Sequence, residues 1–457
     1  MWERALTHTS GYSGDMPAPG RTKFLILGAG IAGLGAGIAA QRNGEDSLIL
    51  EAADAPGGLC RSTEVLGCEF DFGPKIIIER GPDSCADLLG FLGDNYGTYP
   101  MAESAYLSEF GLVGFPLQRY LVDLPRAERD LIIDDLMHGR ATPSPVRSYQ
   151  DWLVNSYGRY FCEKILFPYE EKKWQRALSD MDYQWALRRP VSVDIDEVLE
   201  GAERRLPPQR VYHYPREGSI AALTGGLVEH AGPMVLNSAV TAIDPVQKYV
   251  VAGGRRYDYE HLISSLPLDK AIGMTSGIDG LADHDELLTW LSIRVFNLVF
   301  AGDHALDGTA IYFPGKEFVF RRVSVLENLC PALGRSGLTP ISVEISLDSC
   351  GAQADQEDQY EQVLRELWTI PQFAGLGEPV DHRVLEVPHA YPVPRNGMQD
   401  FVAQVHDTYA RFDIHHCGRG GRFDYCNIDV AFEQGKQAVA GVLAAERTRT
   451  AEGKVAR

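Results

Sequence analysis

The chain has 457 residues, of which 45% are hydrophobic and 23% charged, a composition typical of a folded globular protein and not of a disordered one. Its length favours two or three domains over one compact core. With 43 Lys and Arg against 63 Asp and Glu, the formal charge of −20 opposes binding to nucleic acid and to anionic membranes, so we expect neither as a partner.

The chain begins with a segment that has no regular pattern. Residues 1–20 carry glycines and prolines without periodicity, so we expect a mobile leader. They lack the charged, apolar and small-residue order of a signal peptide, and the chain has no run of 18 apolar residues. We therefore expect a cytoplasmic protein.

A βαβ unit is predicted directly after this segment. The apolar run 23–27 predicts a buried strand, the small-residue-rich stretch 31–43 predicts a helix, and residues 47–50 predict a second parallel strand.

Three glycines, Gly28, Gly30 and Gly33, connect the first strand to the helix. Glycines at this spacing turn the chain tightly, let a pyrophosphate approach the backbone, and let the helix meet the sheet. Glu51 ends the second strand, where an acidic residue bonds ribose hydroxyls. The sequence thus predicts a Rossmann-type dinucleotide site, and the alternative is a chance glycine-rich turn.

The rest of the chain predicts helical and β regions in turn. Residues 83–210 are mostly helical in pattern, and residues 235–265 are typical of a β meander that returns to the dinucleotide domain. Alternation between 290 and 350 predicts an antiparallel sheet with substrate contacts, with strands at 294–301, 318–325 and 341–347. Helices are expected at 355–367 and from 429 to about 447.

No metal or disulfide chemistry is predicted. The eight cysteines form no Cys-x-x-Cys pair, which favours reduced thiols. His415, His416 and Cys417 are adjacent in sequence, and neighbours on an extended strand face opposite ways, so they are not expected to ligate one ion.

Residues 55–62, APGGLCRS, follow the second predicted strand. They resemble the second glycine motif of the amine-oxidase-like flavoprotein superfamily, in which backbone amides and an arginine approach the pyrophosphate and the flavin edge. The resemblance implies FAD as cofactor, bound by Gly57, Gly58 and Arg61. The alternative is a loop that uses glycines for turning alone. In the same resemblance residues 70–75, FDFGPK, run beside the isoalloxazine, with Gly73 and Pro74 as contacts.

Four later segments resemble UDP-galactopyranose mutase, especially its longer eukaryotic-type form, and more loosely the protoporphyrinogen oxidase relatives. With the amino-terminal motifs they span nearly the whole chain. The first, FPYEEKKW at 167–174, is an aromatic cluster typical of core packing, and we assign it no chemistry. The second pairs YFP at 312–314 with FRR at 320–322. It implies that Tyr312, Arg321 and Arg322 bind substrate, with Arg322 gripping the diphosphate, and the alternative is a surface arginine pair.

The third segment, AYPVP at 390–394, implies that the Tyr391 hydroxyl donates to a phosphate oxygen, whereas a tyrosine before proline is equally able to close a turn in the core. The fourth, GRGGRFDYCNID at 418–429, precedes a predicted helix that Asp429 is placed to cap. By resemblance Arg419 and Tyr425 face the diphosphate. The residues that the resemblance places near the cofactor are Gly418, Arg419, Asn427 and Asp429. A purely structural loop is the alternative.

The sequence departs from the mutases at one position beside the flavin. Lys75 stands where they carry histidine. Lys75 is a candidate for stabilising anionic reduced flavin or for binding a different sugar group. The alternative is that its side chain points to solvent, as most lysines do. Phe423 also replaces the usual tryptophan, and the fourth motif is two residues shorter. The nucleotide and the sugar are therefore left open.

The resemblance implies an isomerase that interconverts the pyranose and furanose forms of a nucleoside-diphosphate sugar. In the mutases N5 of reduced FAD attacks the anomeric carbon, displaces the diphosphate and forms a flavin–sugar adduct, without net oxidation. NAD(P)H is a candidate reductant. The implied catalytic residues are Arg322, Arg419, Tyr391, Tyr425 and Lys75. The alternatives are an FAD oxidase or dehydrogenase for an amine, porphyrin-like or natural-product ring, and a silent flavin-binding scaffold.

The expected fold class is α/β: a Rossmann-type FAD-binding domain with an inserted helical domain and an antiparallel β-sheet substrate domain. The expected domains are a leader at 1–20, a discontinuous FAD-binding domain at 21–82, 211–270 and 386–450, a mainly helical domain at 83–210, and a substrate domain at 271–385.

Overall fold

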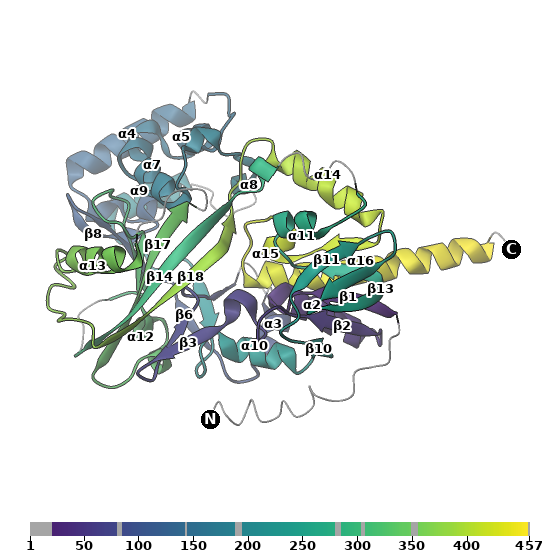
Figure 1. Cartoon of the computed structure of the whole chain (residues 1–457). Coiled ribbons are helices and arrows are strands. Elements are labelled where there is room, and N and C mark those ends of the chain that lie inside the picture. The colour runs from purple at the N-terminus through teal and green to yellow at the C-terminus, as the bar shows by residue number, and fades with distance from the viewer. Residues whose placement is uncertain are drawn as a thin grey trace.

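The computed structural model describes residues 21–79, 85–141, 144–187, 194–278, 285–302, 307–348 and 355–455. A mostly parallel sheet with its helices, a long antiparallel sheet and a cap of helices make up the molecule (Figure 1). The predicted leader at 1–20 lies outside the described residues.

The first sheet carries the predicted βαβ unit. Its strands run in the order β10 (Met234–Val235), β2 (Ser47–Leu50), β1 (Thr22–Leu27), β13 (Arg255–Ser264), β12 (Tyr249–Ala252) and β11 (Val240–Asp244), and β19 (Ile414–His416) also pairs with β13. The pairs of β1 with β2 and with β13 are parallel. The parallel core strands are buried on both faces, which explains why β1 and β2 are continuous apolar runs. The two predicted strands and the helix α2 (Ile31–Arg42) are confirmed.

The second sheet is long and mostly antiparallel. Its order is β18 (Asp381–Pro392), β14 (Trp290–Ala301), β17 (Leu338–Asp348), β16 (Arg322–Val325), β15 (Ala310–Tyr312), β7 (Glu103–Leu107) and β8 (Gly111–Phe115). One face packs against α13 (Gln356–Leu367) through a core of phenylalanine and aliphatic side chains. The opposite face carries Glu344 and Arg322, which are cross-strand neighbours on β17 and β16.

Two of the expected domain boundaries differ from this arrangement. Strands β7 and β8 come from the range 83–210, expected to be mainly helical, and β7 pairs with β15 of the second sheet. Strand β18 crosses the expected boundary at residue 385 and continues to Pro392. The local pattern predicts that a segment is extended, but its partner strand lies far away in the sequence and leaves no local signal.

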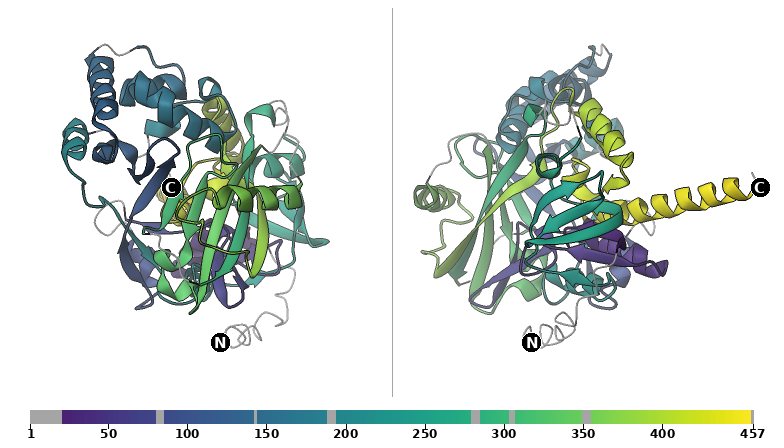
Figure 2. Two further views of the ribbon diagram at one scale, coloured as in Figure 1. Left: turned by 90° about the vertical axis from the view of Figure 1, so that its left-hand side faces the viewer. Right: turned by 45° about the vertical axis from the view of Figure 1, so that its right-hand side comes forward.

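Helices between residues 126 and 203 form a cap over one end of the second sheet (Figure 2). They are α4 (Arg126–Ala141), α5 (Tyr149–Tyr157), α6 (Arg159–Phe161), α7 (Phe167–Trp174), α8 (Gln184–Leu187) and α9 (Ile195–Glu203), with a π-helical segment at Cys162–Leu166. Aromatic side chains, including Trp174 and Phe161, fill the core of the cap. The aromatic motif at 167–174 therefore contributes to core packing, as predicted, and its first turn carries Pro168.

Smaller elements complete the fold. The remaining helices are α3 (Ala86–Gly90), α10 (Ala221–Val228), α11 (Leu268–Met274), α12 (Leu326–Leu329), α14 (Met398–Ala410), α15 (Gly418–Gly421) and α16 (Ile428–Val455). The remaining strands are β3 (Ser62–Val65) paired with β4 (Cys68–Asp71), and β9 (Val211–Tyr214) between β5 (Ile77–Ile78) and β6 (Gly97–Pro100).

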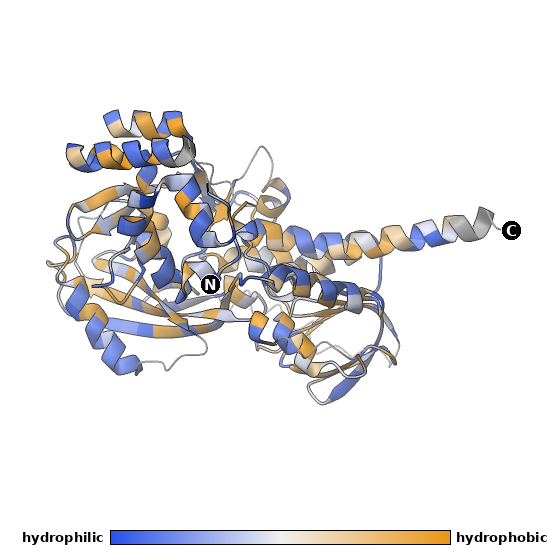
Figure 3. Cartoon of the chain, turned by 90° about the horizontal axis from the view of Figure 1, so that it is seen from above, coloured by the Kyte–Doolittle hydropathy of each residue, from blue (hydrophilic) through white to orange (hydrophobic). Residues whose placement is uncertain are grey.

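Helix α16 begins one residue before the predicted position. Asp429 therefore lies in its first turn and is not the residue that precedes the helix, so the prediction that it caps the helix is wrong. The carboxyl-terminal part of α16 extends away from the body, and its hydrophilic and hydrophobic residues are interspersed (Figure 3). Among the described helices, α16 included, none combines the length and the apolarity needed to cross a bilayer.

The contact between α16 and α2 gives a stability prediction. A Cβ at Gly435 would lie 1.9 Å from the carbonyl oxygen of Ala32, whereas a Cβ at Gly441 on the same helix would meet nothing within 4 Å. Gly435→Ala should lower the unfolding free energy by about 1–3 kcal/mol through overpacking. Gly441→Ala should raise it by up to about 1 kcal/mol because alanine favours helix. Thermal unfolding of both variants checks this, and equal shifts would contradict the helix contact.

Candidate functional site

The glycine loop after β1 has the geometry that a dinucleotide requires. Gly28 has a φ of +92°, which makes the tight turn. A Cβ at Gly33 would lie 1.8 Å from the Gly28 carbonyl oxygen, so the close approach of helix and strand depends on glycine there. A Cβ at Gly30 would meet nothing within 4 Å, so this position is open to an approaching phosphate at the start of α2.

Glu51 and the second glycine motif lie beside this loop. The Glu51 Oε2 atom accepts a hydrogen bond of 2.6 Å from the Ala29 amide, which holds the carboxylate against the glycine loop. Gly57 forms a β-bridge with Gly30 and donates to the Ala29 carbonyl at 2.8 Å. The first and second glycine motifs, predicted separately, therefore form one backbone surface.

Arg61 lies at the edge of this surface. Its Nε atom donates to the Gly58 carbonyl at 3.2 Å, and its guanidinium carbon lies 5.0 Å from the centre of the Phe72 ring. Because the guanidinium is about one third exposed and lies next to the glycines, it is available to an anion there.

The segment 73–75 lies between the two glycine motifs, which we call the cofactor loops (residues 28–33 and 57–61), and the second sheet. The Lys75 ammonium donates to the carbonyls of Phe72 at 2.7 Å and Gly73 at 2.9 Å, so the side chain folds back onto its own segment and does not extend into solvent. Burial lowers the pKa of Lys75, while nearby Tyr391 and Glu344 raise it. A Cβ at Gly73 would lie 3.2 Å from Glu344 Oε1, so this segment lies directly against the second sheet.

Asp71, the last residue of β4, holds the segment 73–75 in place through hydrogen bonds. Its Oδ2 atom accepts from the Lys75 amide at 3.2 Å and from the Tyr214 hydroxyl at 2.9 Å. Burial raises the pKa of Asp71 to about 6, although these hydrogen bonds act to lower it. The backbone around Gly73 and Pro74 is thereby held in one conformation.

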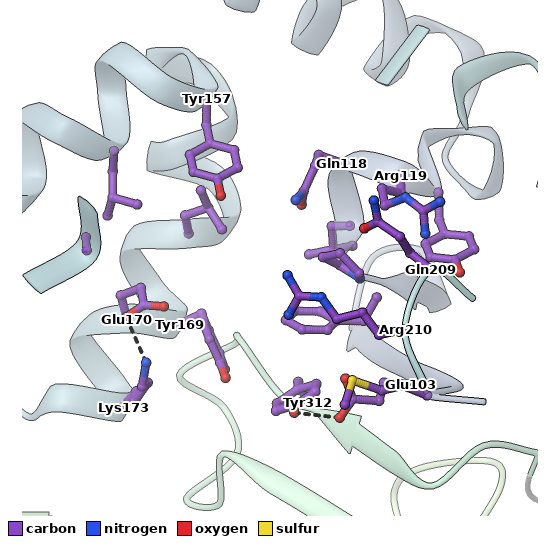
Figure 4. A pocket seen from close by; sticks show the side chains of 18 of the residues that line it. Glu103, Gln118, Arg119, Tyr157, Tyr169, Glu170, Lys173, Gln209, Arg210 and Tyr312 are labelled. Atoms are coloured by element: carbon purple, nitrogen blue, oxygen red, sulfur yellow. Dashed lines mark hydrogen bonds and ion pairs between the residues drawn. The ribbon is translucent and has the colours of Figure 1, made fainter. Parts of the chain in front are cut away.

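A pocket of about 300 Å³ lies between the helical cap and the second sheet. Five of the predicted substrate residues line it: Tyr312, Arg321, Arg322, Tyr391 and Tyr425. Figure 4 shows Tyr169, Glu170 and Lys173 of α7 on one side, Gln118, Arg119, Gln209 and Arg210 on the other, and Tyr312 with Glu103 at the base. The Tyr312 hydroxyl donates to Glu103 Oε1 at 2.8 Å, so its proton is engaged within the protein.

Arg321 and Arg322 share one buried carboxylate, that of Glu344. The Nη2 atom of Arg321 lies 2.5 Å from Glu344 Oε2, and Arg322 donates to Glu344 Oε1. The Glu344 side chain is 1% exposed. Burial by itself raises its pKa, but Arg322 and Arg321 outweigh burial and lower the pKa to about 2. Glu344 therefore remains charged at any ordinary pH, and the three groups together carry one net positive charge.

Glu344 was missed in the sequence because its role depends on its neighbours. The signal that points to it is an acidic residue at the centre of β17, whose other central residues are apolar or small, and a charge is almost never buried without a partner.

Tyr391 lies among these cations. The guanidinium carbon of Arg419 is 4.8 Å from the centre of its ring and that of Arg321 is 5.8 Å away. Tyr391 also stacks on Tyr425, with ring centres 5.1 Å apart. Burial raises the pKa of Tyr391, but Arg321, Arg419 and Lys75 together lower it to about 7.

Arg419 is placed by backbone carbonyls. It donates from Nη1 to Ala390 at 2.8 Å and from Nη2 to Cys426 at 2.6 Å, so it joins the end of β18 to the loop before α16. Arg419 and Lys75 are not among the described residues that line the pocket, and both lie next to Tyr391. A direct contact of Arg419 with a diphosphate stays a prediction.

Asn427 immediately precedes α16, and its carbonyl accepts the Ala431 amide at 2.9 Å. Gly418, with a φ of +72°, packs so closely on α2 that a Cβ there would lie 2.6 Å from Ala32 Cβ. Gly418 therefore lies beside the start of α2, where the glycine motifs meet.

Lys173 is a pocket residue to which the sequence motif gave no chemistry. It is 5% exposed, and its ammonium lies 3.4 Å from Glu170 Oε2 and over the rings of Trp174 and Tyr425. The wall nearest Tyr425 therefore carries a buried ion pair. The sequence feature that indicates Lys173 is the pair of lysines, Lys172 and Lys173, inside an aromatic motif.

The position of Tyr391 between cations predicts an unusual titration. Its ordinary pKa is 10, so a phenolate absorbance change centred near pH 7 should appear in the folded protein and disappear in Tyr391→Phe. Tyr425→Phe, which removes the stacked partner hydroxyl, should retain the change. Because the folded pKa is the lower one, the ionised phenolate stabilises the fold fully above pH 10 and this contribution is lost as pH falls through 7. A wild-type protein whose tyrosines all titrate near pH 10 would contradict the arrangement.

Comparisons with known proteins agree with this geometry at the level of fold. Residues 26–88 match the model of the NAD(P)-binding Rossmann-like domain. A 77-residue segment, 17% of this chain, is 35% identical to an uncharacterized protein in the nifH2 3′ region of Methanothermococcus thermolithotrophicus and covers 71% of that protein.

Solved structures match along nearly the whole chain. Reduced UDP-galactopyranose mutase has a TM-score of 0.85 at 22% identity, over 93% of this chain and 96% of the mutase. A putative protoporphyrinogen oxidase from Exiguobacterium sp. 255-15 has a TM-score of 0.72 at 16% identity, over 93% and 99%. Putrescine oxidase bound to putrescine has a TM-score of 0.64 at 17% identity, over 93% and 99%. The chain therefore belongs to the same family as the Methanothermococcus protein and has, as the sequence resemblance predicted, the fold of UDP-galactopyranose mutase and of these oxidases.

Proposed function

We propose that the protein is an FAD-dependent enzyme that interconverts the pyranose and furanose forms of a nucleoside-diphosphate sugar. The observation that carries the proposal is the group of Arg321, Arg322 and Tyr391 at the pocket, next to the segment 73–75. Such a group has the charge and the hydrogen-bond donors that a diphosphate requires.

The residues around the glycine loops fit FAD. Gly30 leaves open space at the start of α2, the Gly57 and Gly58 backbone lies beside it, and Glu51 is held where ribose hydroxyls reach in Rossmann domains. The segment 73–75 and the residues before α16 would hold the flavin end. When bound and reduced, FAD supplies the nucleophile that displaces the diphosphate from the anomeric carbon.

The charges of the described residues suit a dianionic leaving group. Glu344 neutralises one of the two pocket arginines and holds both in fixed orientation, so the remaining N–H donors of Arg321 and Arg322 need no reorganisation to meet phosphate oxygens. On the adjacent wall Lys173 is paired with Glu170, so this wall contributes N–H donors and no net charge. As the bond to the anomeric carbon breaks, charge accumulates on the diphosphate, and fixed cations stabilise that charge.

Tyr391 has a further role in this scheme. A phosphate group bound beside it would favour the neutral phenol over the phenolate, so the hydroxyl would regain its proton and donate to a phosphate oxygen. The stacked Tyr425 holds the ring in place from the side of the cap.

An amine oxidase activity is the alternative that the fold permits. An amine substrate is a cation in its ordinary protonated form, and the net positive charge of the Arg321, Arg322 and Glu344 group opposes its binding in this pocket. The charge of this group therefore favours the isomerase over an amine oxidase.

The direct test is an anaerobic assay of the FAD-loaded protein. After reduction with dithionite, the protein is incubated with a panel of nucleoside-diphosphate sugars and the products are separated by chromatography. We expect one sugar nucleotide to isomerise, with reduced flavin required and no peroxide formed. Inertness toward the whole panel, together with peroxide formation from an amine or a porphyrinogen in air, would reject the isomerase.

Replacement of Arg322 tests the role of the cation. Arg322→Met should lower kcat for the isomerisation by about 10²–10³-fold, because it removes a fixed stabiliser of the leaving group. Arg256→Met is the matched control, since Arg256 is an exposed arginine paired with Asp258 on β13 and should leave kcat unchanged. Equal FAD content and thermal unfolding temperature show that each variant is folded. An unchanged kcat in folded Arg322→Met would remove this residue from the catalytic set.

A further inference from the structure

Lys172, on α7, connects the helical cap to the second sheet. Its ammonium donates to the carbonyls of Phe313 at 2.8 Å and Phe320 at 3.3 Å, and also to that of Gly315. An ammonium has three N–H donors, and here each has a carbonyl to meet. A lysine that satisfies three carbonyls of one short segment acts as a clamp on the backbone of that segment.

The clamped segment joins two strands that carry pocket residues. It runs from the end of β15, which finishes at Tyr312, to the start of β16 at Arg322. Phe313 directly follows Tyr312, and Phe320 directly precedes Arg321. Two of the three contacts of Lys172 are therefore made next to residues that line the pocket.

Side chains hold the other side of the segment. The rings of Phe313, Phe318 and Phe320 pack together with centres 4.8–5.5 Å apart in the core beneath α13. Glu366 of α13 accepts the Val319 amide at 2.6 Å. These contacts anchor the rings and the middle of the segment, and they leave the carbonyls of Phe313 and Phe320 to Lys172.

We propose that Lys172 is a positioning residue, which fixes the segment 313–320 against the cap and thereby sets the place of Arg321 and Arg322 in the pocket. It touches no substrate and acts through the two arginines. The same helix carries Tyr169 and Lys173 on the pocket wall, so Lys172 also sets the distance between that wall and the arginines. The part of this role that concerns a diphosphate rests on the proposed function.

An exposed ion pair between the same two elements supplies a matched control. Lys316, in the clamped segment, lies 3.6 Å from Glu171, the neighbour of Lys172 on α7, and both side chains are exposed. Such a pair contributes little because water screens it. Lys316→Met therefore removes a lysine contact across the same junction without releasing the three carbonyls.

The first measurement is amide hydrogen exchange of residues 313–321 in the FAD-loaded protein. Lys172→Met should speed exchange there by about tenfold or more, because it removes hydrogen bonds from partly buried carbonyls, while Lys316→Met should match the wild type. Exchange of β1 and β13 should stay as in the wild type in both variants, which shows that the cofactor domain is folded. Unchanged exchange of 313–321 in Lys172→Met would overturn the proposal.

The second measurement is the affinity for uridine diphosphate. Lys172→Met should raise its Kd by about tenfold, and Lys316→Met should leave it unchanged. Faster exchange with an unaltered Kd would also overturn the proposal, because the segment would then not position the arginines. A wild-type protein that binds no uridine diphosphate and isomerises no sugar nucleotide would reject the proposed function, and the exchange comparison alone would then decide whether Lys172 fixes the segment.

Discussion

The site depends on the buried carboxylate of Glu344, which holds Arg321 and Arg322 together. Loss of one partner from a buried ion pair costs on the order of 3–5 kcal/mol, so the carboxylate and the arginines require one another. Glu344 faces Arg322 across β16 and β17, and it also lies against Gly73. One charged group therefore orients the pocket cations and places them next to the segment expected to contact the flavin.

The pocket is assembled from parts that are distant in sequence. The βαβ unit and the second glycine motif form the cofactor surface, β16 supplies the arginine pair, the end of β18 supplies Tyr391, and α7 closes one wall. Contacts outside the pocket fix the last three of these parts: Arg419 joins β18 to the loop before α16, and Lys172 joins α7 to the segment before β16. Rigid support of this kind keeps charged donors oriented before a ligand arrives, which is what electrostatic catalysis requires.

Local structure was predicted well from the sequence, and the pairing of distant strands was not. The strands of the βαβ unit, helix α2 and helix α13 follow from apolar runs and periodicity, and the roles of Gly28 and Gly33 follow from backbone geometry. The pairing of β7 with β15 and the passage of β18 through residue 385 have no local signal, because a strand does not encode its partner. Arg321, Arg322, Tyr391 and Tyr425 lie around one pocket, and their role in binding a diphosphate stays a prediction. Glu344, Lys172 and Lys173 take their places from neighbours that the sequence does not name.

In the proposed function these cations receive a diphosphate beside the flavin. A crystal structure of the dithionite-reduced, FAD-loaded protein with a bound nucleoside-diphosphate sugar tests it most directly. We predict diphosphate oxygens within hydrogen-bonding distance of Arg321 or Arg322 and of the Tyr391 hydroxyl, with the sugar between them and the flavin. A ligand bound elsewhere, with both arginines still directed to Glu344 alone and an apolar molecule in the pocket, would contradict the account.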